Sequence, residues 1–185
     1  MSVTLPGTTI EVSAVTKGIS RTLFGGIFAA GGITLSQVSV MTGLEPYDVQ
    51  NWVKRGFVSS PVGRVYSKDQ FARICIINLL RESLMLPDII KMLGSINGNL
   101  SDESDDLICD SELYHKYVDI TADCNALKLG DGAIMPAVEA AAADYKEPQP
   151  GAKKRLVGVL SVMAYAHLAK TAKAKAMELL CGLDG

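Results

Sequence analysis

The sequence predicts a mainly α-helical protein with a small β-hairpin, and three observations lead to this fold class. Apolar residues recur at intervals of three and four along most of the 185-residue chain, which is the spacing of one face of an α-helix. Two short helical segments are joined by a glycine-containing turn, as in a helix–turn–helix unit. Between residues 57 and 67 the pattern changes to two short apolar runs around a Pro/Gly turn, which is typical of a hairpin.

The N-terminal region, residues 1–32, is predicted to be an arm followed by a helix. Residues 1–8 are rich in Thr, Pro and Gly, so we expect them to be frayed. Intermittent apolar residues between Ile10 and Phe28 leave room for one helix.

Residues 33–98 carry the strongest local signals. Thr34 or Ser36 can cap a helix over Leu35–Met41, which Gly43 ends because glycine tolerates the left-handed conformation of a C-cap. Pro46 suits the first turn of a second helix, which Arg55-Gly56 closes. In this second helix Val49, Trp52 and Val53 share one face and are predicted to point to the core.

The hairpin follows directly. We expect strands at Phe57–Ser59 and Val65–Ser67 around a turn at 60–64, forming a wing. Ser67 then caps a helix that runs to Arg81 or Glu82, with Gln70 at the reciprocal capping-box position. Pro87 opens one further helix.

The C-terminal half is predicted to be helical. Residues 99–151 comprise an acidic linker and helices, namely Ser111–Leu127 and the alanine-rich Pro136–Tyr145. Residues 152–185 hold a long helix, Ala152–Cys181, which would span about 45 Å. Its Ala/Leu/Val face suits either the core or a dimer seam.

Charge and composition limit the function. The hydrophobic fraction of 48% is that of a globular chain. The net charge of −2 and the pI of about 5.7 argue mildly against nucleic-acid binding. However, residues 33–91 hold seven Lys/Arg against five Asp/Glu, whereas residues 92–150 hold three against twelve. The acidity is therefore concentrated outside the predicted helix–turn–helix.

The sequence shows no motif that is typical of catalysis, metal binding or membrane insertion. The four cysteines (Cys75, Cys109, Cys124 and Cys181) form no CxxC pair, and the two histidines lie in no metal-ligand spacing. We find no nucleophile elbow, phosphate loop or paired carboxylates. No apolar run reaches the ~18 residues of a membrane span, and no signal peptide is present. We expect a cytoplasmic protein with reduced thiols and no catalytic residue, metal, cofactor or membrane partner.

The outward face of the second helix is the predicted DNA-binding surface. Gln and Asn can bridge adenine edges, and Lys or Arg can reach guanine or phosphate. A basic residue at the wing tip and one at the start of the next helix can hold backbone phosphates. The candidate residues are Tyr47, Gln50, Asn51, Lys54, Arg55, Arg64 and Lys68. Any solvated helix would also show polar residues on this face, so both interpretations of Gln50 and Asn51 stay open.

These residues resemble regulators of the MerR family. Ile33–Leu44 is similar to the opening helix of that family, Lys54–Val58 to its exit into the wing, Gly63–Ile74 to its wing-to-helix segment and Leu86–Leu93 to its closing helix. The resemblance covers about a third of the chain. It implies a MerR-like winged helix-turn-helix, duplex DNA as partner and a homodimer.

The chain departs from the MerR pattern in two places. Typical members carry an arginine followed by paired aromatics where this chain has Gln50-Asn51-Trp52. They also follow the winged helix directly with a dimerisation helix, whereas an acidic linker and two shorter helices intervene here.

The bacterial group catalogued as domain of unknown function 1836 is a closer match. It resembles this chain over Leu44–Phe57, Asp102–Asp106 and Asp110–Tyr114. This resemblance implies a MerR-like fold and brings no established activity.

Two hypotheses follow. The first is a transcriptional regulator that binds DNA through the winged helix, with the helical C-terminal half dimerising or sensing a signal of unknown chemistry. The second is a protein-interaction adaptor that reuses the scaffold without DNA, which the acidic pI and the missing arginine favour.

Overall fold

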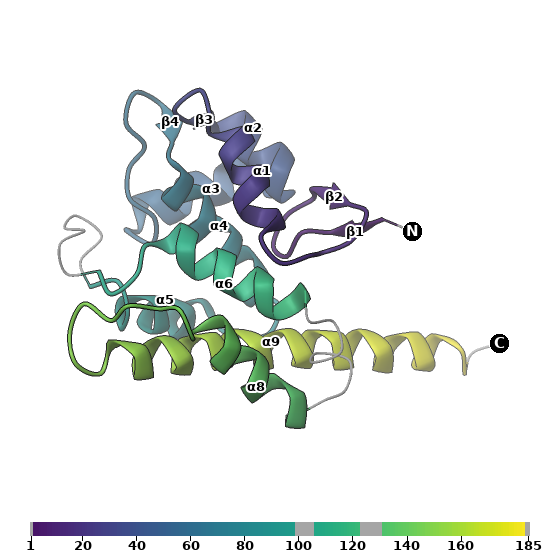
Figure 1. Ribbon diagram of the computed structural model, residues 1–185. Helices are drawn as coiled ribbons and strands as arrows, with labels where there is room; N and C mark the ends of the chain where they lie inside the picture. Colours follow the sequence, from purple (N-terminus) through teal and green to yellow (C-terminus); the bar gives the residue numbers. More distant parts are fainter. Residues whose placement is uncertain (1, 99–105, 123–130, 184–185) are drawn as a thin grey trace.

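The computed structural model describes residues 2–98, 106–122 and 131–183, and it is mainly helical (Figure 1). The acidic stretch 99–105 and the predicted end of the 111–127 helix lie outside the described residues. The helices are α1 (Ile19–Ile27), α2 (Leu35–Thr42), α3 (Pro46–Lys54), α4 (Lys68–Leu80), α5 (Leu86–Gly94), α6 (Asp110–Ala122), α8 (Asp131–Ala141) and α9 (Ala152–Cys181). The strands are β1 (Val3–Thr4), β2 (Glu11–Val12), β3 (Ile33–Thr34) and β4 (Val65–Tyr66).

The described part of the N-terminal arm, residues 2–8, is ordered, so the prediction that this stretch is frayed is wrong. Strands β1 and β2 pair antiparallel and close a small hairpin. Leu5 is fully buried in the core, and the amide of Asn78 on α4 donates to the carbonyl of Gly7. Tyr114 on α6 also donates to the carbonyl of Pro6. A buried leucine and long-range hydrogen bonds thus hold a segment whose composition suggested disorder.

The predicted hairpin is wrong in its pairing. Phe57–Ser59 forms no strand, although it lies within the described residues, and β4 instead pairs antiparallel with β3 (Ile33 opposite Tyr66). The reason is that side chains of α4 take the acceptors that a strand would have needed. Gln70 Nε2 donates to the carbonyls of Ser59 and Ser60, and Arg73 Nε donates to the carbonyl of Phe57.

Helix α4 is the centre of the N-terminal half. From Phe71 to Leu80 nearly every side chain is buried. It packs on α2, α5, α6 and α9. One continuous hydrophobic cluster therefore joins the helix–turn–helix to the C-terminal helices.

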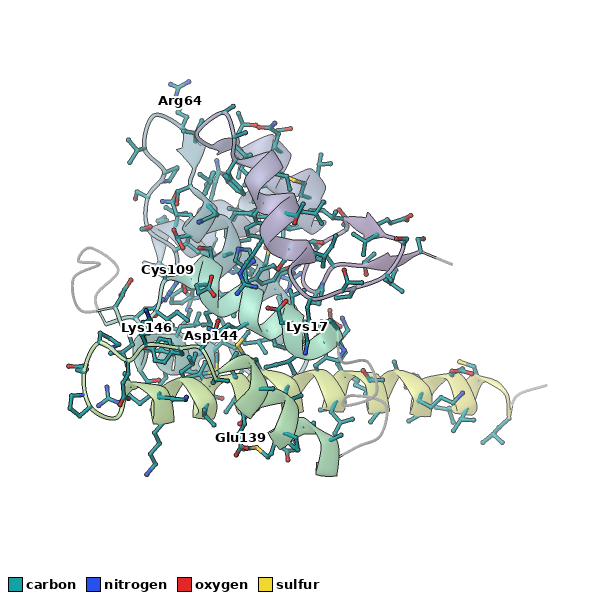
Figure 2. All side chains as sticks on the ribbon, viewed as in Figure 1. Lys17, Arg64, Cys109, Glu139, Asp144 and Lys146 are labelled. Carbon is teal, nitrogen blue, oxygen red and sulfur yellow. The ribbon has the colours of Figure 1, made fainter. Side chains whose placement is uncertain are left out.

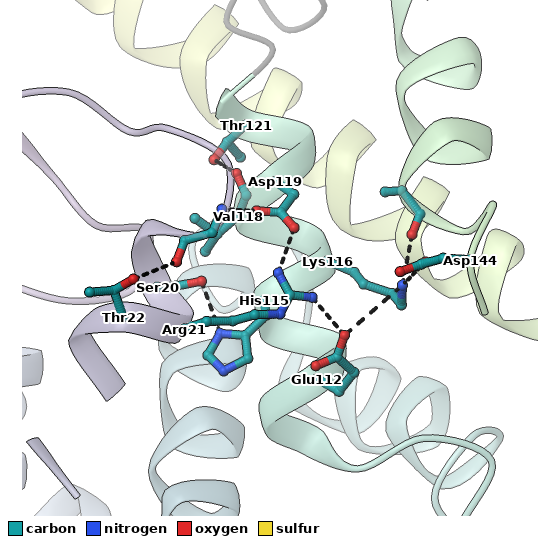
Figure 3. Close-up of polar contacts among 12 residues, drawn as sticks. Ser20, Arg21, Thr22, Glu112, His115, Lys116, Val118, Asp119, Thr121 and Asp144 are labelled. Atoms are coloured by element: carbon teal, nitrogen blue, oxygen red, sulfur yellow. Dashed lines mark hydrogen bonds and ion pairs between the residues drawn. The ribbon is translucent and has the colours of Figure 1, made fainter. Parts of the chain in front are cut away.

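Helix α6 is buried although half of its residues are polar. Arg21 on α1 bridges Glu112 at 2.6 Å and Asp119 at 2.7 Å (Figure 3). Lys116 Nζ lies 2.6 Å from a carboxylate oxygen of Asp144, beyond the end of α8. Charged and polar side chains on a buried helix need such partners because an unpaired buried charge is strongly destabilising.

The two C-terminal helices complete the bundle. Helix α8 begins at Asp131, about one turn before the predicted start at Pro136, so the proline lies inside the helix. Helix α9 has the predicted bounds. Its first half packs on the bundle, whereas the second half extends past the body of the protein (Figure 1). Within the described residues, no helix is both long and apolar enough to cross a membrane.

Replacing Gly7 by alanine tests the docking of the arm. Gly7 has φ +73°, and a Cβ there would lie 2.3 Å from the carbonyl oxygen of Cys75 on α4. We expect Gly7→Ala to lower the free energy of unfolding by about 2 kcal/mol or more, from left-handed strain and overlap together. Urea denaturation measures this change.

Gly25→Ala is the matched control. Gly25 lies inside α1, and an added Cβ would meet nothing within 4 Å. This substitution should raise the free energy of unfolding by up to about 1 kcal/mol, because alanine favours helix. Equal effects of the two substitutions would contradict the docked arm.

His115 provides a second test, of the buried state of α6. Burial and then the charge of Arg21 lower its pKa to about 4, and its Nδ1 lies 2.9 Å from Ser20 Oγ. Because the pKa of the folded protein lies below the unfolded value near 6.5, the neutral ring stabilises the fold above pH 6.5. That contribution is lost as the pH falls toward 4. An NMR titration of the ring should show a midpoint near pH 4, and a midpoint near 6.5 would show that the ring is solvated.

Candidate nucleic-acid interface

The two helices predicted to form a helix–turn–helix correspond to α2 and α3, and their boundaries follow local rules. Thr34 Oγ1 accepts from the amide of Gln37 while the Gln37 side chain accepts from the amide of Thr34, so Thr34 is the cap of the two candidates. Gly43 ends α2 in the left-handed conformation at φ 70°. Pro46 lies in the first turn of α3. The turn therefore fixes the direction in which α3 leaves α2.

Helix α3 has a core face and a solvent face. Val49 and Trp52 are buried in the core, which confirms the prediction for Trp52. Tyr47 is 74% exposed, Gln50 and Lys54 are exposed, and Asn51 is half-buried. Within the described residues, the polar side of α3 is thus open to solvent.

The segment between α3 and β4 ends in a tight turn with Arg64 at its tip. Val62 and Val65 form a bridge across this turn, and the amide of Val65 donates to the carbonyl of Val62 at 3.1 Å. The side chain of Arg64 points away from the body of the protein (Figure 2). The predicted turn at 60–64 is therefore present, although β4, which follows it, pairs with β3.

Arg64 holds an uncommon backbone conformation. Its φ of 66° makes it the only non-glycine residue with positive φ in the described part of the chain. A left-handed residue with a Cβ costs about 1–2 kcal/mol relative to the right-handed form. Glycine would relieve this cost, so the arginine side chain is present at the tip at the expense of stability.

Gln70 positions residues 57–64, the tip segment that leads to Arg64. From its sequence pattern only a capping role was predicted for this residue. Ser67 and Gln70 form the predicted capping box of α4. The Gln70 amide nitrogen also reaches Ser59 Oγ at 3.1 Å as well as the carbonyls of Ser59 and Ser60. One side chain thus ties the start of α4 to the segment that leads to Arg64. Lys68, in the first turn of α4, is exposed beside this junction.

Two arginines near α3 stack on aromatic rings. The guanidinium of Arg55 lies 4.5 Å from the centre of the Phe57 ring, and that of Arg81 lies 5.8 Å from the centre of the Trp52 ring. Arg81 also lies 4.0 Å from a carboxylate oxygen of Asp48. The positive charge of Arg81 therefore offsets the negative charge of Asp48 on α3. The sequence does not reveal this role, because Arg81 lies at the end of α4 and far from Asp48 along the chain.

The seven predicted residues come from three elements. Five belong to α3 or follow it directly, Arg64 lies at the tip, and Lys68 lies in the first turn of α4. Six of them are exposed and Asn51 is half-buried. Lys54 and Arg55 are neighbours at the end of α3, whereas Arg64 lies at the far end of the segment that follows.

Comparison with known proteins gives one match. Residues 34–117 match a family model described as a domain of unknown function, DUF1836. No curated protein and no solved structure matches the chain. The matched residues run from the cap of α2 through α3, the tip and α4 into α6, so this part of the chain is similar to the DUF1836 family.

Proposed function

We propose that the protein is a DNA-binding transcriptional regulator with a MerR-like winged helix-turn-helix. The observation that carries the proposal is the solvent-exposed polar side of α3, held by a capped α2 and a glycine turn. The second helix of such a unit enters the major groove. Gln50, Asn51, Lys54 and Arg55 would contact base edges, with Tyr47 beside them.

Arg64 and Lys68 would bind backbone phosphates. Both are exposed basic residues on short, rigidly held segments. A phosphate contact fixes the position of the protein on the duplex without reading its sequence. A functional contact of this kind would explain why an arginine is retained at a position that favours glycine.

We further propose that the protein acts as a homodimer joined through α9. The residues Val162, Tyr165, Ala169, Ala172, Ala176 and Leu179 follow each other at alternating spacings of three and four. This is the heptad pattern of a coiled-coil seam. All six are exposed, and they lie on the side of α9 opposite Leu156, Leu160 and Met163, which are buried in the core.

The protruding half of α9 needs a partner for a second reason. Residues 171–181 are exposed all around the helix. Most helical stability in proteins comes from the packing of an apolar face, which these exposed side chains lack. A second copy packed along the seam would cover the apolar side chains, including Leu179 at 60% exposure.

The alternative is a protein-interaction adaptor. The observation that favours it is the exposure of three apolar side chains, namely Val40 on α2, Tyr47 on α3 and Val62 in the turn before β4. Apolar side chains of this kind suit a protein partner better than a phosphate backbone. Co-purification of a stable protein partner together with a failure to bind heparin or DNA would select this alternative.

DNA binding is tested by fluorescence polarisation on genomic fragments across a salt series. At least one fragment should bind more tightly than random duplex. Arg64→Gly should weaken binding to every fragment and reduce the slope of log K against log salt by about 0.9, because it removes one phosphate contact. Lys54→Ala should weaken binding to the preferred fragment by about 1–3 kcal/mol, because it removes a base-edge contact. Lys91→Ala, an exposed lysine on α5, should leave binding unchanged.

Arg64→Gly has a second expected result. It should raise the free energy of unfolding by about 0.5–1 kcal/mol, because relief of left-handed strain exceeds the entropy cost of glycine. A variant that is more stable and yet binds DNA more weakly cannot be explained by misfolding. No preference for any fragment, with no effect of Arg64→Gly, would refute the proposal.

The dimer is tested with a matched pair of substitutions on α9. Ala172 lies on the seam and Ala174 lies off it, and both are exposed. Ala172→Asp should shift the protein to monomer in sedimentation equilibrium because it places like charges opposite each other across the seam. Ala174→Asp makes the same chemical change at the same helix propensity and should leave the dimer intact. Identical masses for the two variants would contradict this interface.

A further inference from the structure

The C-terminal end of α2 is where the turn to α3 begins. The last four carbonyl groups of an α-helix have no donor within the helix and need partners from elsewhere. In α2 these groups belong to Ser39, Val40, Met41 and Thr42. The donors that they find show what holds the turn in place.

One of the four carbonyls, and the turn itself, are satisfied locally. The amide of Gly43 donates to the carbonyl of Ser39 at 2.8 Å. The hydroxyl of Thr42 accepts from the amide of Leu44 at 3.3 Å and donates to the carbonyl of Val38 at 2.7 Å. These bonds shape the turn, whereas the remaining three carbonyls need donors from other parts of the chain.

The donors to these three carbonyls are remote in the sequence. The hydroxyl of Thr9 donates to the carbonyl of Val40 at 2.7 Å, and the amide of Thr9 donates to the carbonyl of Met41 at 2.9 Å. On α4, Asn78 Nδ2 donates to the carbonyl of Thr42 at 3.0 Å. The N-terminal arm and α4 together thus complete the end of α2.

The arm and α4 are also joined to each other at this point. Asn78 Nδ2 donates to the carbonyl of Gly7 at 3.0 Å, so one amide group holds both the arm and α2 against α4. Gly7 lies so close to α4 that an added Cβ would be 2.3 Å from the carbonyl oxygen of Cys75. An added Cβ on Gly43 would lie 3.1 Å from the methyl group of Thr9. This close fit leaves little room for the arm to shift relative to either helix.

The arm clamp, which consists of residues 7–9 and Asn78, lies close to the start of α3. Only residues 43–45 separate α2 from α3. A connection this short passes a shift at the end of α2 directly to the start of α3. Val49 and Trp52 are buried and hold α3 to the core, so the clamp governs the direction of the helix and not its formation.

We propose that Thr9 and Asn78 are positioning residues for DNA recognition, which set the direction of α3 through the end of α2. This inference rests on the proposed DNA binding. Phosphate contacts at Arg64 and Lys68 carry no sequence information and come from other segments, whereas base contacts need α3 in one orientation. Loss of a clamp bond lowers the fraction of protein in that orientation, and the apparent affinity for a preferred site falls with this fraction.

Two substitutions at Thr9 isolate the hydroxyl group. Thr9→Val removes the hydroxyl and keeps the β-branched shape, whereas Thr9→Ser keeps the hydroxyl. In fluorescence polarisation, Thr9→Val should lower the ratio of the affinities for the preferred fragment and for random duplex about twofold to tenfold, the range for one hydrogen bond. Thr9→Ser should retain the ratio of the wild type. Asn78→Leu removes two hydrogen bonds and should lower the ratio further.

This ratio distinguishes positioning from a loss of stability. A variant that is only less stable contains less folded protein for either duplex, so its ratio of affinities stays that of the wild type. The affinity for random duplex should not change in Thr9→Val. An unchanged ratio in Thr9→Val or in Asn78→Leu would overturn the positioning role of the residue replaced.

Hydrogen exchange in the free protein tests the clamp without DNA. In Thr9→Val the amides of Gly43 and Leu44, which bond within the turn, should exchange at least about twofold faster than in the wild type. The amide of Phe28, at the end of α1, should keep its rate. Equal acceleration at all three amides would indicate a general loss of stability, and an unchanged rate at Gly43 would show that the hydroxyl does not hold the turn. Either result would refute the proposal.

Thr22→Val is the matched control. Thr22 is an exposed threonine of α1 whose hydroxyl donates to the carbonyl of Gly18 within the same segment. Its replacement should leave both the affinity ratio and the exchange of Gly43 as in the wild type, and equal effects of Thr22→Val and Thr9→Val would contradict the clamp. If the wild type prefers no fragment, the proposed DNA binding fails, and the exchange rates alone decide whether the arm holds the turn before α3.

Discussion

The burial of polar side chains on α6 is the constraint on which the rest of the structure depends. A helix in the centre of a bundle can carry charged and hydroxyl groups only if each receives a partner, because an unpaired buried charge costs several kcal/mol. The partners come from every neighbouring layer. They are Ser20 and Arg21 on α1, Pro6 in the arm, Arg73 on α4, Asp144 after α8 and His167 on α9. Helix α6 therefore sets the position of each of these segments.

Arg73 connects this constraint to the candidate interface. One side of its guanidinium pairs with Asp110 at the start of α6, and Nε donates to the carbonyl of Phe57 directly after α3. Gln70, one turn earlier on the same helix, holds Ser59 and Ser60. The segment that carries Arg64 is consequently fixed to the C-terminal half through α4. Arg73 and Gln70 therefore link Asp110 on α6 to the segment that leads to Arg64.

The elements that could be predicted from sequence are those with local causes. The ends of α2, α3, α4 and α9 were predicted to within one or two residues, because Thr34, Gly43, Pro46 and Ser67 act on backbone atoms within four residues of themselves. The errors arose where the partner is remote. Residues 57–60 do not pair as a strand, and their carbonyl groups instead accept hydrogen bonds from side chains on α4. The arm is ordered through contacts of Leu5 and Asn78.

The sequence by itself determined the order of helices, the turn at Gly43 and the division of α3 into apolar and polar faces. These features follow from periodicity and capping, which are short-range. Only the tertiary structure decided that Asn97, Arg73 and Asp110 meet below the tip, and that the seam of α9 faces solvent. The reason is that burial and charge pairing join residues tens of positions apart. The type of a side chain shows which kinds of partner it can bind, whereas only the packed structure shows which partners lie within its reach.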